Sequence, residues 1–304
     1  MNAADETRES APESPIASLL NTLELVDTGA RTSEDIFTGP SQWVPHLRVF
    51  GGQVMAQAVV AAMRTIDAER PIHSVHGYFL RPGDVTKPIT FSVDRIHDGR
   101  SFATRRTQAY QDGVPILSMI ASFQTREPGF EFQVAMPEGL ADPESLPSAA
   151  EILGGIDHPA AQHWAHGRAF DLRHVDGPLY FEDPNRARVP HQALWVRAID
   201  TLPDDANLHR AAIAYLSDYT ILEPVMRQQG ASWTRPGAKV ASLDHAVWWH
   251  HDARVDEWLL YVQETTANGG GRGLSHGRLY TKEGTLVASV AQEGMVRIPG
   301  AATE

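Results

Sequence analysis

Apolar and polar residues alternate along several stretches of this chain, as in residues 90–93 (TFSV). Alternation with a period of two predicts β-strands that bury one face. Two long stretches, residues 74–124 and 243–296, follow the same plan, which is a strand followed by a three-strand meander. We therefore predict two copies of one antiparallel unit.

Residues 51–66 (GGQVMAQAVVAAMRTI) have a different pattern, because they are apolar around nearly the whole circumference of a helix. Only Gln53 and Gln57 form a polar pair, at positions i and i+4. A helix of this kind is buried on most sides, and its alanines let a sheet approach closely. The fold class predicted is α+β, with a sheet wrapped around a central helix.

The same order recurs in the second half of the chain. Residues 191–199 predict a strand, and residues 209–222 predict a helix that Glu223-Pro224 ends or kinks. This second helix precedes the second meander, as residues 51–66 precede the first.

The two copies differ in their polar residues when they are aligned on His76 with His245 and on Ser118 with Ser289. Polar residues of the second copy then face apolar residues of the first: Asp244 opposite Val75, Thr265 opposite about Val93, and Gln292 opposite Ala121. Polar residues that are present in only one of two repeats indicate a catalytic role. We therefore expect the active site in the second copy.

The length of 304 residues suggests about two domains. We expect a disordered acidic tail over residues 1–15, an N-terminal unit over 16–126 and a C-terminal, catalytic unit over 169–304. Residues 127–168 are rich in Pro, Ala and Gly and predict a linker that crosses the surface.

Composition narrows the function classes. A net charge of −12 argues against nucleic-acid binding, which depends on neutralising phosphates. No apolar run reaches the roughly 18 residues that span a bilayer, and the N-terminal residues lack a hydrophobic signal core, so we expect a cytoplasmic protein. Zero cysteines exclude disulfides, thiolate metal ligands and a cysteine nucleophile.

Two motifs suggest other chemistry, but their sequence context argues against it. Residues 273–277 (GLSHG) match the GxSxG elbow of serine hydrolases, but the following residues predict a strand rather than a helix, and His276 is the last histidine of the chain. His245, His250 and His251 have no nearby acidic residue at a recognisable ligand spacing. We predict neither a serine-hydrolase elbow nor a metal site.

Six blocks of sequence, in the same order, carry a resemblance to a known family: VFGGQVMAQA (49–58), HSVHGYFLRPGD (73–84), DGRSFATRRTQAYQDG (98–113), ASLDHAVWWH (241–250), ETTANGGGRGL (264–274) and VASVAQEGMVR (287–297). The chain resembles the acyl-CoA thioesterase II family. The resemblance implies a double hotdog, in which two antiparallel sheets each wrap around a central helix. It also implies hydrolysis of medium- to long-chain acyl-CoA to fatty acid and CoA without a cofactor, in a homo-oligomer (dimer or tetramer).

The resemblance further implies a catalytic triad of Asp, Thr and Gln, which falls on Asp244, Thr265 and Gln292, with the adjacent Thr266 as an alternative threonine. In this hypothesis Asp244 accepts the proton of a water that Thr265 and Gln292 hold. A histidine near the site is an alternative base, because its pKa lies near neutrality.

Further binding candidates follow from the same hypothesis. Free backbone N–H groups at Gly51 and Gly52 would form the oxyanion hole. His76, Arg100 and Arg272 are additional candidates for substrate binding.

Two other functions remain open at this point. A hotdog enoyl-CoA hydratase shares the fold and the ligand, although the chain has no Asp-x-Asn-Pro-x-His segment of the kind those enzymes carry. A non-catalytic acyl-CoA binder or sensor would retain its ligand without releasing CoA.

Overall fold

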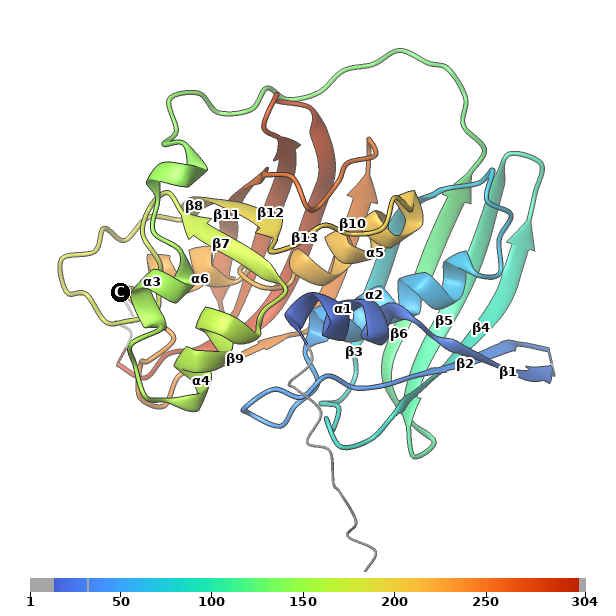
Figure 1. The fold of residues 1–304 in the computed structure, drawn as a ribbon, viewed down its shortest axis with the longest axis horizontal. Helices are drawn as coiled ribbons and strands as arrows, with labels where there is room; N and C mark the ends of the chain where they lie inside the picture. Colours follow the sequence, from blue (N-terminus) through green and yellow to red (C-terminus); the bar gives the residue numbers. More distant parts are fainter. Residues whose placement is uncertain (1–13, 32, 301–304) are drawn as a thin grey trace, which may run out of the picture.

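The computed structural model describes residues 14–31 and 33–300 (Figure 1). Residues 1–13 of the predicted tail lie outside these ranges, whereas Pro15 already begins a helix that Ser14 caps. The helices are α1 (Pro15–Leu23), α2 (Gly51–Met63), η1 (Pro143–Ser145), α3 (Ala149–Leu153), α4 (Pro159–Gln162), η2 (His163–Gly167), α5 (Ala206–Leu216) and α6 (Glu223–Gln228).

The described residues form a 13-stranded antiparallel sheet. Its strands are β1 (Val26–Arg31), β2 (Asp35–Gly39), β3 (Ile72–Phe79), β4 (Ile89–Asp98), β5 (Phe102–Gln111), β6 (Val114–Gln124), β7 (Phe170–His174), β8 (His191–Ala198), β9 (Lys239–Ser242), β10 (Asp244–Trp249), β11 (Leu259–Gly269), β12 (Arg272–Thr281) and β13 (Leu286–Arg297). The strand order is β1-β2-β4-β5-β6-β3-β10-β13-β12-β11-β8-β7, and β9 pairs with β13.

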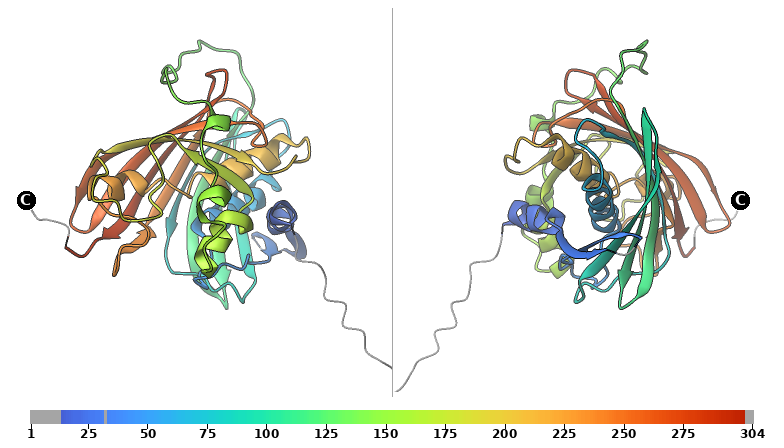
Figure 2. Two further views of the ribbon diagram at one scale, coloured as in Figure 1. Left: turned by 60° about the vertical axis from the view of Figure 1, so that its left-hand side comes forward. Right: turned by 90° about the vertical axis from the view of Figure 1, so that its right-hand side faces the viewer.

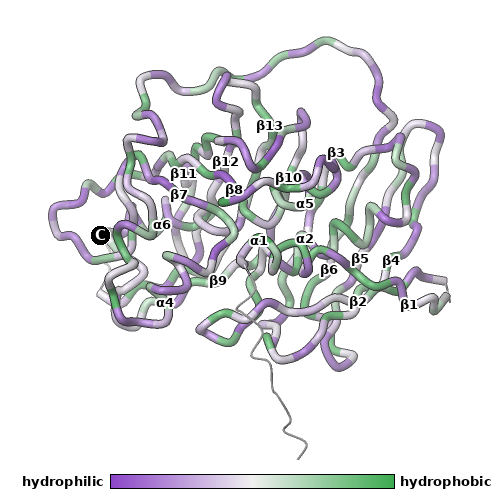
Figure 3. The backbone as a smooth tube through the Cα atoms, viewed as in Figure 1, coloured by the Kyte–Doolittle hydropathy of each residue, from purple (hydrophilic) through white to green (hydrophobic). Residues whose placement is uncertain are grey.

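The sheet consists of two halves that meet where β3 pairs with β10, with Val75 opposite Val247. Each half contains a meander, β4-β5-β6 in the first and β11-β12-β13 in the second. Figure 2 shows the sheet curving around the helices, and Figure 3 shows hydrophobic and hydrophilic residues alternating along its strands. The predicted architecture, two strand-and-meander units side by side around central helices, is confirmed.

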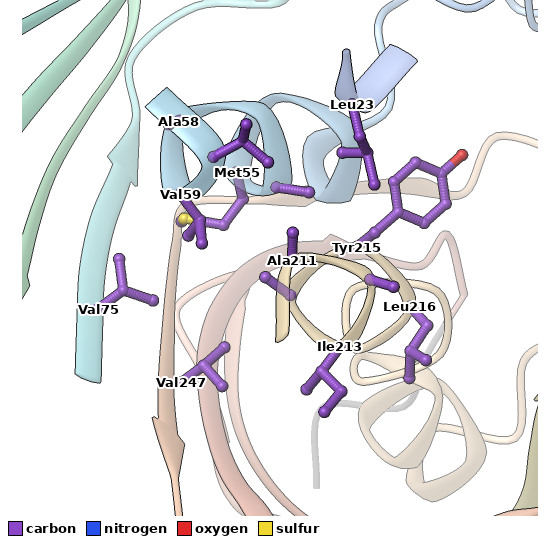
Figure 4. Packing of buried hydrophobic residues seen from close by; sticks show 14 of the residues in the cluster. Leu23, Met55, Ala58, Val59, Val75, Ala211, Ile213, Tyr215, Leu216 and Val247 are labelled. Carbon is purple, nitrogen blue, oxygen red and sulfur yellow. The ribbon is translucent and has the colours of Figure 1, made fainter. Parts of the chain in front are cut away.

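Helix α2 lies inside the first half and is almost fully buried, as its sequence predicts. Its two glutamines are satisfied: Gln53 Nε2 donates to Gln57 Oε1 at 3.1 Å, and Gln57 Nε2 donates to the carbonyl of Thr22 at 2.9 Å. Helices α2 and α5 pack against each other, and Met55 lies near Val75 at the junction of the halves (Figure 4). The glutamine pair therefore belongs to the core.

The helix predicted over residues 209–222 differs from the structure. It begins earlier, at Ala206 after the cap Asp205, and it ends at Leu216. Pro224 does not end it, but lies in the first turn of the next helix, where proline is tolerated because its missing N–H would have no helical partner. Residues 217–222 are therefore a turn, and this turn carries the site described below.

The predicted linker is only partly irregular. Residues 125–142 contain no helix or strand and appear in Figure 1 as the green trace over the molecule. Gln133 attaches this segment to the second half by donating to the carbonyl of Gly284 at 2.7 Å. The remaining residues form the short helices from η1 to η2, where Leu153 packs with Tyr180. Among the described helices, none is long and apolar enough to cross a membrane.

Candidate functional site

A row of polar side chains crosses the inner face of the second half. Thr265 of β11 pairs with Ser275 of β12, and Ser275 pairs with Gln292 of β13. His245 of β10 contacts Gln292 directly, because its Nδ1 is hydrogen-bonded to Gln292 Oε1. Directly paired residues point to the same face of a sheet, so these four side chains lie side by side.

Gln292 connects this row to a carboxylate from outside the sheet. Its Nε2 donates to Asp218 Oδ1 at 2.9 Å and lies 2.8 Å from Ser242 Oγ, and Ser242 Oγ donates to the same Asp218 oxygen at 2.9 Å. Asp218 comes from the turn after α5, and Ser242 ends β9. The structure therefore assembles Asp218, Ser242 and Gln292 into a compact triangle.

The orientation of the Gln292 amide follows from its neighbours. Its nitrogen must face Asp218, since a carboxylate accepts hydrogen bonds and does not donate them. The amide oxygen therefore faces His245 and accepts the hydrogen of Nδ1. The other ring nitrogen, Nε2, lies 2.8 Å from Ser217 Oγ. This assignment of His245 and Gln292 comes from the hydrogen-bond network as a whole.

Asp218 and His245 influence each other's protonation. Burial raises the pKa of Asp218, against the opposing effects of His245 and of the hydrogen bonds from Gln292, Ser242 and Gly52. Burial lowers the pKa of His245, although Asp218 and Gln292 act in the opposite direction. A neutral imidazole beside a carboxylate whose proton affinity is increased by burial suits acid–base chemistry near neutral pH.

The N-terminus of α2 completes the site. The N-cap Phe50 provides no side-chain hydrogen bond, and Asp218 instead accepts a hydrogen bond from the backbone N–H of Gly52. A Cβ on Gly51 would lie 2.7 Å from Asp218 Oδ2, which is too close for any side chain. Glycine is therefore required for the helix to approach the carboxylate, and the positive end of the helix dipole faces it.

Asp218, Ser242 and Gly51 line a pocket with a volume of about 1090 Å³. Its other lining residues include many aromatic side chains: Trp43, Phe50, Phe79, Trp164, Tyr215, Tyr219 and Trp233. A pocket of this size with apolar walls and one polar cluster is typical of a ligand site.

The structure does not bring Asp244 into this cluster. Residues of β10 alternate between outer and inner faces, so Asp244 points outward beside the exposed Tyr78, while His245 points inward. The Asp244 Oδ1 atom accepts a hydrogen bond from the backbone N–H of Glu293 at 2.6 Å. Gln292 is thus the only member of the predicted triad whose side chain bonds to the Asp218 cluster within the described chain.

A one-residue slip in the alignment of the repeats explains this result. Val75 of β3 is buried and pairs with Ala121, and His245 has the corresponding inward position next to Gln292. The counterpart of Val75 is therefore His245 and not Asp244. A slip of one residue moves a strand side chain to the opposite face.

The other predicted residues lie away from Asp218 or bond elsewhere. Thr265 Oγ1 donates to the carbonyl of Leu274 at 2.8 Å, and Thr266 is exposed at a bulge of β11. His76 is exposed and packs edge-on against Trp248, with ring centroids 4.9 Å apart.

The two predicted arginines are exposed as well. Arg100 lies in the turn between β4 and β5, and Arg272 pairs with Glu293 at 3.0 Å. Neither residue lines the 1090 Å³ pocket, whereas Gly51 does.

Within the described residues, the first half contains no comparable network. Thr65 follows the end of α2 by two residues, as Asp218 follows the end of α5. Its hydroxyl accepts a hydrogen bond from Nε of Arg105, a buried arginine that pairs with Ala121 in the register and forms an ion pair with Asp98 at 2.7 Å. The place of the carboxylate is thus occupied by a threonine held in a structural network.

Sequence reasoning missed Asp218 and Ser242. The available signal was the Ser217-Asp218 dipeptide, because Ser and Asp favour turns and helix ends over helix interiors. Ser275, the serine of the GxSxG match, lies within strand β12, so no elbow is present there. The described residues contain no group of three or more His, Cys, Asp or Glu residues that could hold a metal ion.

Comparisons with known proteins identify the family to which the chain is similar. A family model described as acyl-CoA thioesterase matches residues 175–295, and a model described as acyl-CoA thioesterase N-terminal domain matches residues 39–124. The chain is 34% identical to acyl-coenzyme A thioesterase 8 of Homo sapiens, over 87% of the chain and 85% of that protein. It is also 34% identical to acyl-CoA thioesterase 2 of Haemophilus influenzae, over 86% of the chain and 92% of that protein.

A solved structure shares the whole architecture. The acyl-CoA thioesterase II TesB2 from Mycobacterium marinum superimposes with a TM-score of 0.71 at 39% sequence identity, covering 94% of this chain and all of that one. The fold predicted from the sequence, a double hotdog, is therefore confirmed.

Proposed function

The chain belongs to the acyl-CoA thioesterase family, and we propose that it hydrolyses its acyl-CoA substrate in the pocket beside Asp218, Ser242 and Gln292. The observation that carries this assignment is the hydrogen-bonded triangle of these three side chains at the N-terminus of α2. This triangle shares Gln292 with the triad predicted from the sequence, and the roles of Asp244 and Thr265 stay predictions.

In this proposal Asp218 is the general base. Both side-chain donors, Ser242 and Gln292, reach Oδ1, so Oδ2 is the oxygen directed at Gly51 and toward the substrate. The carboxylate accepts a proton from water, whose oxygen attacks the thioester carbonyl carbon. As the carbon–sulfur bond breaks, the proton passes to the sulfur, so that the products are a carboxylic acid and CoA.

Ser242 and Gln292 position the reacting groups. Each of them donates a hydrogen bond to Asp218 Oδ1 and so holds the carboxylate in a fixed orientation. Gly51 lines the pocket at the first turn of α2, and its backbone N–H is the donor that we assign to the developing oxyanion. The backbone N–H of Gly52 donates a hydrogen bond to Asp218 and so helps to hold the carboxylate.

The acyl group extends along the aromatic wall of the pocket. Phe79, Tyr215 and Tyr219 provide apolar surface next to Asp218, which supports the proposal of a medium- to long-chain acyl substrate. Thiol release from acyl-CoAs of increasing chain length, measured with a thiol reagent, would locate the preferred length. The protein has no cysteine and adds no background to that assay.

The decisive test compares Asp218→Asn with Asp244→Asn. We expect Asp218→Asn to lower kcat by about 10²- to 10⁴-fold, the range for loss of a general base. Asp244→Asn removes a carboxylate on the outer face and should retain wild-type turnover. The reverse result, loss with Asp244→Asn and full activity with Asp218→Asn, would return the base to the residue predicted from the sequence.

We also propose a homo-oligomer and a cytoplasmic location. Tyr78 and Ile120 are exposed on neighbouring strands of the outer sheet face, a surface suited to contact with a second copy. Light scattering of the purified protein would test the oligomer, with a monomeric mass counting against it. Cell fractionation would test the location.

A further inference from the structure

The catalytic pocket has a charge of opposite sign to the rest of the protein. The chain carries a net charge of −12, yet the charged residues that line the pocket are three arginines, Arg48, Arg81 and Arg168, and one carboxylate, Asp218. Such an excess of fixed positive charge raises the local concentration of anionic groups. It indicates that part of the ligand in this pocket is anionic.

Arg168 differs from the other two arginines because it is partly buried. Its guanidinium lies over the ring of Tyr219 at 4.6 Å and over that of Trp164 at 5.0 Å. These cation–π contacts hold the planar group in one position inside the pocket. Tyr219 directly follows Asp218 in the chain, so Arg168 contacts the turn that carries the catalytic carboxylate.

Arg168 forms no ion pair or hydrogen bond through its side chain with another described residue, and its Nε is buried without a partner. The buried Arg105, in contrast, donates to Thr65, to backbone carbonyls and to Asp98. A guanidinium has five N–H donors, and leaving a buried one such as that of Nε without a partner is costly. Buried Arg227 also has an Nε without a partner, but its two other nitrogens donate to protein groups, whereas Arg168 has no side-chain hydrogen bond to another described residue.

The neighbouring histidine does not compete with Arg168 for an anion. Burial, together with the positive charge of Arg168, lowers the pKa of His163 to about 4, so His163 is neutral at pH 7. Arg168 is therefore the fixed positive charge of this inner part of the pocket.

We propose that Arg168 binds an anionic group of the thioester substrate. A guanidinium matches phosphate and carboxylate oxygens with paired N–H donors, so two sources fit: a phosphate of CoA, or a carboxylate at the far end of the acyl chain. The inference rests on the proposed function, because it places the substrate in this pocket. It assigns Arg168 to ground-state binding and not to the chemical step.

The experiment measures binding rather than hydrolysis, so that it remains informative even if Asp218→Asn proves fully active. Calorimetric titrations would use three ligands that cannot be hydrolysed: an S-alkyl-CoA thioether, the same alkyl thioether of pantetheine, which has no phosphates, and an S-alkyl-CoA with a terminal carboxylate. Each would be titrated into wild type, Arg168→Gln, Arg168→Lys and Arg95→Gln.

We expect Arg168→Gln to weaken a ligand that carries the recognised anion by about 10- to 100-fold, as for hydrogen bonds to a charged group. Arg168→Lys keeps the charge but loses the paired donors and should weaken it less. Arg95→Gln removes one equal charge from an exposed ion pair with Asp35 and should bind all ligands as wild type does.

The pattern over the ligands identifies the source. Weaker binding of both CoA thioethers with unchanged binding of the pantetheine thioether assigns Arg168 to a phosphate. Weaker binding of the carboxylate-bearing ligand alone assigns it to the acyl end. Equal loss for all three ligands, or no loss for any, would overturn the proposal, since the pantetheine thioether is uncharged. Thermal unfolding of each variant would exclude global misfolding, and Arg168→Lys carries the test if Arg168→Gln does not fold.

Discussion

His245 of β10 donates the hydrogen of its Nδ1 to Gln292 Oε1 on the neighbouring strand β13. This contact fixes the Gln292 amide with its nitrogen toward Asp218 and Ser242. An inverted amide would direct an oxygen at a carboxylate oxygen, which is repulsive. His245 is thus a positioning residue that acts on the proposed base through Gln292.

The contact predicts the effect of His245 substitutions. His245→Ala frees the Gln292 amide to rotate, and we expect kcat to fall by about 10-fold or more while KM changes little, because misplacement of a catalytic group affects mainly the chemical step. His245→Asn, which can place an amide N–H near the same position, should restore part of the loss. Steady-state kinetics of both variants would check this, and an equal loss in both would indicate a purely structural role.

The raised pKa of Asp218 predicts the acidic limb of the pH profile. Burial disfavours the charged carboxylate, so its pKa lies above the usual 3.8. Only the carboxylate can accept a proton from water, so kcat/KM should fall as the pH decreases through that raised pKa. The residual activity of Asp218→Asn should lack this limb. A wild-type limb at or below pH 3.8, with the protein folded, would contradict the assignment.

The raised pKa of Asp218 also predicts how the stability of the fold depends on pH. The carboxylate that promotes activity at higher pH destabilises the folded protein there. A carboxyl group with a raised native pKa favours folding most at low pH, and this contribution is lost as the pH rises through the native pKa. Asp218→Asn has no charge to bury, so its melting temperature relative to wild type should be higher at pH 8 than at pH 5. Thermal unfolding at both pH values would measure the difference. A difference that decreases with pH would show that the carboxylate is stabilised in the fold.

The sequence could predict those parts of the fold that depend on periodicity. The buried helix at residues 51–63 and the two meanders have clear patterns, and Gln292 faces inward in any alignment that keeps the strand period. Asp218 could not be predicted in this way, because it lies in a turn that the pattern merged into a helix. The alignment that placed Asp244 opposite Val75 is shifted by one residue from the register of the structure, and composition alone does not reveal such a shift when both candidate residues are polar; a catalytic role of Asp244 stays a prediction.

Gly51 allows a separate prediction about the approach of α2 to the carboxylate. In Gly51→Ala the added Cβ would lie 2.7 Å from Asp218 Oδ2 and 3.1 Å from the Phe79 ring, so the helix start or the carboxylate must move. We expect a loss of about 10²-fold or more in kcat, comparable with loss of an oxyanion donor. Gly155→Ala, where a Cβ meets nothing within 4 Å, is the matched control and should be fully active. Equal activity of the two variants would exclude Gly51 from the site.

The turn that carries Asp218 is held by a buried polar chain that ends at Glu223. Thr220 in this turn accepts a hydrogen bond from Gln263 at 2.7 Å, Gln192 donates to Gln263 at 2.8 Å, and Gln192 also donates to Glu223 at 2.9 Å. Burial raises the pKa of Glu223, but His174 and the other hydrogen-bond donors outweigh it, so the pKa lies below its usual value.

This chain predicts that Glu223→Gln destabilises the protein at neutral pH, by about 1–3 kcal/mol for lost hydrogen bonds to a buried charge. A lowered native pKa means that the contribution is present above the unfolded value and is lost as the pH falls, so the variant and wild type should converge in acid. Denaturant unfolding at pH 7 and at a series of lower pH values, below the usual glutamate pKa of 4.5, would test this. Because Thr220 lies two residues from Asp218, kcat of Glu223→Gln should fall together with its stability. The control is Glu264→Gln, which removes an exposed β11 carboxylate that pairs with Arg278. This variant should change neither kcat nor stability. A stable, fully active Glu223→Gln protein would mean that the turn is held without the buried chain.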